Sequence, residues 1–188
     1  GVNCFTLITG YFGTKFNLRK IVSLVFQCCF CVIPIALVCL YVGVMQIEDI
    51  NSIITNFWPL GYWYVVAYIG MLIFVPVLNA FIDSVGYKKL GTFIIAFYIF
   101  VLVFDVCLRD NSSGVMGGYS VLWLMFMYCV GRYVGHINWT SVKTKSIILI
   151  FALCVAIKTC LCLFHINGYR YTNPTIVIAS VCFFLLFL

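Results

Sequence analysis

Apolar residues dominate five long stretches of this chain, and charged residues are almost absent from them. Each stretch is close to the roughly 20 residues that a helix needs to cross the ~30 Å hydrocarbon core of a bilayer. None shows the alternation of apolar and polar positions that is typical of a membrane barrel, so strands are not expected. The pattern predicts helical spans at residues 21–44, 63–82, 90–108, 120–135 and 147–164.

Two shorter apolar stretches lie at the ends of the sequence, at residues 1–12 and 175–188. At about 1.5 Å of rise per residue, a helix of about 12 residues reaches only ~18 Å, which is less than the bilayer core. We therefore expect a partial span at each end, cut from a longer chain. The predicted fold class is an all-α, polytopic transmembrane helix bundle. It has five full spans plus a partial span at each end and forms a single domain over residues 1–188.

The composition places the chain in a membrane, because 65% of its residues are hydrophobic and only 9% are charged. The formal net charge of +6 is interpreted as a topology signal rather than as a nucleic-acid surface. Most basic residues fall in alternate connections, which are expected to be cytoplasmic: Lys15, Arg19, Lys20, Lys88, Lys89, Arg132, Lys143 and Lys145. The other connections hold Arg109 and Arg170. The sequence predicts a multi-pass cell-membrane protein whose partner is the lipid bilayer and not nucleic acid.

The chain contains 11 cysteines, and most of them lie inside the apolar stretches. Cys28, Cys29 and Cys31 have neither His nor acidic neighbours, and they do not lie in a loop, where a structural metal site would form. Cysteines in such positions usually behave as small buried hydrophobic residues. No metal site is expected.

Two ionisable residues, Asp105 and Lys158, lie inside predicted spans, where a charge is costly and is usually paired or functional. Counted back from the predicted outer ends of their helices, they lie about 5 Å and about 9 Å deep. One hypothesis is that the two residues form an intramembrane ion pair. The alternative is that Lys158 extends to the interface by itself.

Three motifs resemble the membrane acyltransferase family (acyltransferase 3). The first is YWYVVAYIGMLIFVPVLNAFI, in which Trp63, Tyr68, Pro76 and Asn79 occupy the places of a Trp-aromatic entry, a mid-helix Tyr, and a Pro and an Asn near the inner end. The second is NCFTLITGYF followed by KFNLRK, and the third is YCVGRYVG. The similarity spreads over most of residues 2–135, and each motif is degenerate.

The resemblance implies an integral membrane O-acyltransferase, most often an acetyltransferase of the bacterial plasma membrane. Such enzymes move an acyl group from cytoplasmic acyl-CoA to a hydroxyl of a cell-surface polysaccharide or a lipid-linked sugar. The family's catalytic His lies on an earlier helix, so it is expected upstream of Gly1 and no catalytic residue is expected in this chain. By itself the chain is therefore expected to be inactive. No bound cofactor is expected, and acyl-CoA (acetyl-CoA) is the donor substrate.

The candidate site residues form two groups. Lys15, Arg19 and Lys20 are candidates for binding the phosphates of acyl-CoA, although they would equally serve as topology anchors. Where the family often has two arginines, this chain has Lys, Arg and Lys. The candidate residues of a channel or acceptor path are Trp63, Tyr68, Asn79, Asp105, Arg132 and Lys158.

The alternative function is that of a non-enzymatic multi-span protein, either a transporter or a flippase-like protein. Transporter folds often carry helices broken by Gly or Pro at matching positions of two repeated halves. Pro34 and Pro76 lie inside predicted spans, but the sequence shows no matching halves. This difference favours the enzyme.

Overall fold

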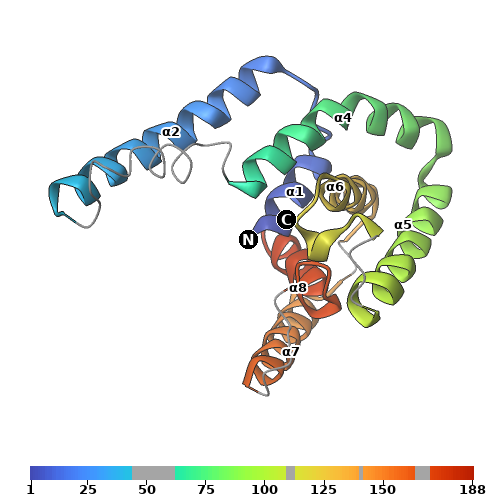
Figure 1. Ribbon diagram of the computed structural model, residues 1–188. Helices are drawn as coiled ribbons and strands as arrows, with labels where there is room; N and C mark the ends of the chain where they lie inside the picture. The colour runs from blue at the N-terminus through green and yellow to red at the C-terminus, as the bar shows by residue number, and fades with distance from the viewer. Residues whose placement is uncertain (44–61, 109–112, 140–141, 164–169) are drawn as a thin grey trace.

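The computed structural model describes residues 1–43, 62–108, 113–139, 142–163 and 170–188 (Figure 1). All regular structure in these ranges is helical. The main helices are α1 (Val2–Tyr11), α2 (Leu18–Tyr41), α4 (Trp63–Val85), α5 (Tyr87–Val101), α6 (Val121–His136), α7 (Thr144–Leu163) and α8 (Pro174–Leu185). A π-helix, η3 (Leu102–Cys107), continues α5, and a short 3-10 turn, η5 (Met116–Gly118), precedes α6.

Four helical stretches of the described chain are long and apolar enough to cross a membrane: Leu18–Tyr41, Trp63–Val85, Tyr87–Cys107 and Thr144–Leu163. They correspond to four of the five predicted spans. The remaining prediction, at residues 120–135, is helical as α6, but α6 has only 16 residues. That is about 24 Å of helix, less than a bilayer core. The all-helical prediction is confirmed, and four described helices, rather than five, have the length of a span.

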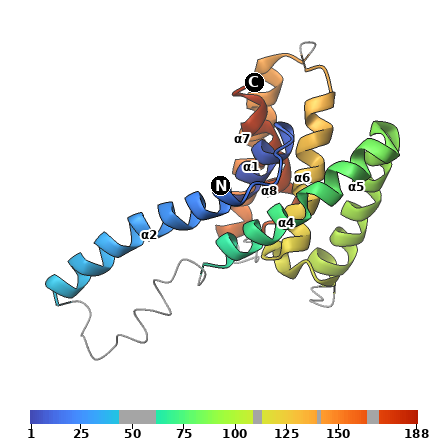
Figure 2. The same ribbon diagram turned by 90° about the horizontal axis from the view of Figure 1, so that it is seen from above.

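Helix α6, which is shorter than a span, lies at the centre of the fold. It contacts α1, α4 and α5, while α8 packs between α1 and α7. The core residues that α6 contributes include Trp123, Leu124, Met127 and Tyr128. By contrast, α2 extends away from the other helices in both views (Figures 1 and 2) and keeps its apolar side chains exposed. A helix with that surface is suited to contact with lipid.

The backbones of α1 and α6 touch where two glycines face each other. A Cβ atom built on Gly10 would overlap the carbonyl oxygen of Tyr128, and one built on Gly131 would overlap that of Leu7. Gly131 and Gly135 form the small-xxx-small pattern that lets helices approach closely in membranes. The motif GRYVG therefore brings α6 against α1.

The helices alternate in direction as the charge pattern predicts. Thr14, in the turn that follows α1, lies near Asn79 of α4, and neighbouring Gly13 lies near Arg132 of α6. At the opposite end, Asn3 of α1 bonds both Trp123 and Tyr171. The first group lies at the end that the basic residues predict to be cytoplasmic, and it is called the inner end below. The second lies at the outer end.

The contact between α1 and α6 should be sensitive to a single methyl group. Gly131→Ala is expected to lower the free energy of unfolding by roughly 1–3 kcal/mol, because the added carbon would meet backbone that cannot move aside. Gly135→Ala is the matched control, since its nearest neighbour is the ring of Tyr11 at 3.2 Å, and a side chain can shift. Unfolding in detergent, followed by circular dichroism, measures both. Equal stability of the two variants would contradict the packing.

Candidate functional site

A polar network at the inner end joins the end of α1 to α4 and α6. The hydroxyl of Tyr128 donates a hydrogen bond to Oδ1 of Asn79 at 2.7 Å. Nδ2 of Asn79 donates in turn to the carbonyl of Thr14 at 3.4 Å. Three elements that are far apart in the sequence therefore meet at one amide side chain.

Arg132 lies beside this network, one helical turn beyond Tyr128. Its Nη2 is 3.6 Å from Oδ1 of Asp83, whose side chain is 71% exposed, so the ion pair contributes little. The Nε of Arg132 is buried and has no hydrogen-bond partner among the described residues. The guanidinium also lies directly against Gly13, where an added Cβ would meet Nη1. The charge of Arg132 is thus only partly matched, and it lies against the turn between α1 and α2.

Lys15, Arg19 and Lys20 follow that same turn, and all three are exposed. The side chain of Asn17 caps α2 by accepting a hydrogen bond from the Arg19 backbone amide at 2.9 Å. The first turn of α2 carries Arg19 and Lys20 and no acidic residue. Cations are unfavourable at a helix N-terminus, which attracts anions. The arrangement favours an anionic ligand at this end.

Tyr68, a further predicted path residue, lies about three turns closer to the outer end of α4 than Asn79 does. The hydroxyl of Tyr68 is 2.9 Å from that of Thr9 on α1. Tyr68 and Asn79 are eleven positions apart, a spacing of about three turns that predicts one shared face of α4, and these bonds show that this face turns to the bundle interior. Whether that face forms a path for an acceptor stays a prediction.

Trp63 lies at the outer end within an aromatic group. Its ring is 4.6 Å from that of Tyr119 and 5.6 Å from that of Tyr171, measured between centroids. Burial raises the pKa of Tyr171, and the nearby Tyr119 adds to the shift. Tyr171 therefore keeps its proton at neutral pH and above.

Asp105 is fully buried at the outer end, and both its oxygens are bonded. Oδ1 accepts a hydrogen bond from the Gly117 amide at 2.8 Å, and Oδ2 accepts one from Thr172 at 2.6 Å. Nη1 of Arg170 lies 3.2 Å from Oδ1 and also donates to the backbone carbonyl of Asp105. Gly117 has φ +66°, a conformation that favours glycine. Through these bonds the carboxylate holds residues 170–172 and η5 against η3.

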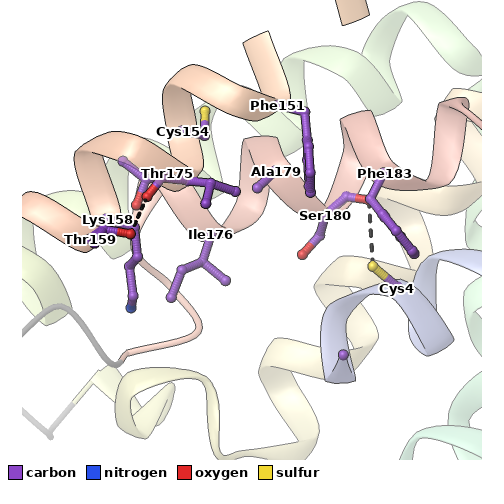
Figure 3. Close-up of a pocket in the computed structure, with 12 residues that line it drawn as sticks. Cys4, Phe151, Cys154, Lys158, Thr159, Thr175, Ile176, Ala179, Ser180 and Phe183 are labelled. Carbon is purple, nitrogen blue, oxygen red and sulfur yellow. Dashed lines mark hydrogen bonds between the residues drawn. The ribbon is translucent and has the colours of Figure 1, made fainter. Parts of the chain in front are cut away.

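The predicted ion pair between Asp105 and Lys158 is wrong, because Asp105 pairs with Arg170. Lys158 lines a separate groove between α7 and α8 (Figure 3). The charge pattern places Arg170 in an outer connection, so the depth of residues within the helices does not indicate it as a partner of Asp105. The chain instead folds back there, and the Tyr171 amide donates to the Gly117 carbonyl at 2.8 Å.

Several residues of these networks were not predicted. Tyr128 lies four positions before Arg132, on the same face of α6, and this spacing could have identified it. The partnership of Thr9 with Tyr68, and of Arg170 with Asp105, had no local signal because each joins distant segments.

Comparisons with known proteins do not assign the site. No protein-family model, curated protein or solved structure matches the chain. Within the described ranges, no group of three or more His, Cys, Asp or Glu residues is placed to hold a metal ion.

The contact between Asp105 and Arg170 should appear as strong coupling in a double-mutant cycle. Arg170→Met leaves the carboxylate buried without its cation and is expected to destabilise the fold by about 3–5 kcal/mol. Asp105→Asn combined with Arg170→Met should cost less than the sum of the single changes. The control cycle combines Asp105→Asn with Lys158→Met and should be additive. Unfolding free energies in detergent measure both, and coupling only in the second cycle would refute the pairing.

Proposed function

We propose that this chain belongs to an integral membrane O-acyltransferase that takes an acyl group, in the first instance acetyl, from cytoplasmic acyl-CoA. The observation that carries the proposal is the convergence at the inner end. There Arg132, whose Nε is buried without a partner, lies against the turn that leads to Lys15, Arg19 and Lys20. These cations are far apart in the sequence and lie toward one end of the fold.

The chemistry of the donor fits such a place. CoA carries several phosphate groups, and guanidinium and ammonium groups bind phosphate through charge-assisted hydrogen bonds. The N-terminus of α2 lies at the same end, and the positive end of its helix dipole adds to the attraction for anions. The basic residues would hold the nucleotide part of the donor at the membrane surface.

The Asn79–Tyr128 pair lies next to Arg132, on the bundle side of it. The hydroxyl proton of Tyr128 is held by Asn79 and one amide hydrogen of Asn79 is held by Thr14, which leaves the second amide hydrogen of Asn79 as a donor suited to the negative charge that develops on a thioester oxygen during acyl transfer. Tyr68 and Thr9 form a second polar contact between α1 and α4, closer to the outer end of α4, and these two contacts define a line along the helices. We propose that the acyl group enters along this line. The proposed acceptor is a hydroxyl of a surface polysaccharide or lipid-linked sugar, and the proposed location is the bacterial plasma membrane.

A transporter or flippase is the competing class, and one observation disfavours it. Pro34 lies inside the continuous helix α2, and Pro76 lies inside the continuous helix α4. Transporter sites are typically formed by helices that unwind at such positions. Neither proline marks an unwound segment here.

Binding of acetyl-CoA is the direct test, because the resemblance places the catalytic His outside this sequence. The full chain in nanodiscs should bind acetyl-CoA, and affinity should fall with salt. Changing Lys15, Arg19 and Lys20 to Gln should weaken binding by about tenfold, the summed effect of three exposed cation–phosphate contacts. Dephospho-CoA should bind the unchanged chain more weakly than CoA does. The triple Gln variant should bind the two compounds with equal affinity.

Lys143→Gln with Lys145→Gln is the matched control, since it removes basic residues from the same predicted side of the membrane. This variant should keep its affinity within about twofold. Absence of acetyl-CoA binding, or an equal loss in the control variant, would overturn the proposal.

A further inference from the structure

Helix α2 carries an exposed amide side chain close to its middle. The helix has 24 residues, and Gln27 lies nine positions after its first residue, Leu18. At about 1.5 Å per residue, Gln27 is ~14 Å along a helix of ~36 Å, so it lies within about 4 Å of the midplane of a bilayer that α2 crosses. The side chain of Gln27 is exposed, and among the described residues none forms a hydrogen bond with its amide.

An amide at this depth requires a polar partner. Hydrocarbon cannot replace the hydrogen bonds that the amide makes in water, and polar side chains within a membrane usually bond across a contact between helices. The nearest interface is roughly 11 Å away along α2, which is farther than a Gln side chain reaches. We therefore expect a polar group of another segment to meet α2 at the depth of Gln27.

A groove beside Gln27 has room for the side chains of a further helix. It has a volume of about 390 Å³ and lies between α2 and the start of α4. Gln27, Cys28 and Cys31 line it from α2, while Tyr64 and Val65 line it from α4. Because α2 extends away from the other helices, this side of it can be approached within the membrane (Figures 1 and 2).

A second copy of the chain carries a suitable group at the required depth. Two copies that insert with the same topology have Gln27 at the same distance from the membrane surface. An amide is both a donor and an acceptor, so two copies related by a twofold axis along the membrane normal can exchange two hydrogen bonds. Ser23 and Cys31, which lie one turn to either side of Gln27, are exposed and small, so they permit a close approach.

We propose that this chain forms a twofold-symmetric homodimer in the membrane through α2. The Gln27 side chains of the two copies bond each other reciprocally, with Ser23 and Cys31 at the same contact. Each α2 places side chains in the groove between α2 and α4 of the other copy, and its remaining surface faces lipid. The dimer does not depend on the proposed acyl transfer.

Förster resonance energy transfer between full chains in phosphatidylcholine liposomes tests the association. Donor and acceptor fluorescent proteins are fused after Leu188, and the protein-to-lipid ratio is varied. Transfer should rise with this ratio, and at a fixed ratio it should depend linearly on the fraction of acceptor-labelled chain, as for a dimer. Transfer no greater than that of unassociated chains at the same density would overturn the proposal, whether lipid or another segment of the same chain covers α2.

Variants of Gln27 test the part that the amide takes. Gln27→Leu, which keeps α2 helical and apolar, should raise the dissociation constant about five- to tenfold, the effect of two interhelical hydrogen bonds. Gln27→Asn should stay within about twofold of the unchanged chain, and so should the control Cys29→Leu on the opposite face of α2. Circular dichroism confirms that each variant is folded. Unchanged association of Gln27→Leu, the result expected if Tyr64 of the same chain holds the amide, would refute the contact.

Native cysteines report which face of α2 forms the contact. Cys31 lies four positions from Gln27 and shares its face, whereas Cys29 lies two positions away, about 200° around the helix. Chains that keep only one of these cysteines, with the other native cysteines replaced by alanine, are oxidised with copper phenanthroline in liposomes. Cys31 should give a covalent dimer on a non-reducing gel, and Cys29 should give little. Crosslinking of Cys29 as efficient as that of Cys31 would contradict the proposed face.

Discussion

The close contact between α1 and α6 is the interaction on which the rest of the structure depends. Gly10 and Gly131 bring the two backbones together without intervening side chains. In lipid, where burial of apolar side chains gives little drive for association, packing at small residues supplies much of the stability. Because α6 also contacts α4, the position of α1 sets the position of the polar groups that α1 shares with α4 and α6.

Both polar ends of the bundle follow from this contact. At the inner end, the end of α1 meets Asn79 and Tyr128, and the connection to α2 passes Arg132. At the outer end, Asn3 accepts a hydrogen bond from Trp123 at 3.0 Å and donates one to the carbonyl of Tyr171 at 3.1 Å. The inner end keeps an incompletely matched cation. The outer end satisfies its buried carboxylate completely, which suits an anchor for the connections rather than a binding site.

Much of the fold could be predicted from the sequence, because helices in lipid must satisfy their own backbone and so appear as long apolar stretches. The interior face of α4 was also predictable, since Tyr68 and Asn79 are eleven positions apart, about three turns. The central position of α6 was not. Its sequence is nearly as apolar as that of the exposed helix α2, and hydrophobicity does not distinguish contact with protein from contact with lipid. The partner of Asp105 was missed for a related reason. Arg170 was counted as part of an outer connection, and only the tertiary fold shows that its segment returns to η3.

The central claim is that Arg132 and the basic residues after α1 face the cytoplasm together, while the Asp105 cluster faces outward. Labelling from each side of sealed vesicles with a membrane-impermeant thiol reagent tests it most directly. Single cysteines are placed at Lys15, Lys88 and Asn173 in a chain whose native cysteines are replaced by alanine. The account predicts labelling of positions 15 and 88 from the cytoplasmic side only, and of position 173 from the outer side only. Labelling of positions 15 and 173 from the same side would contradict it.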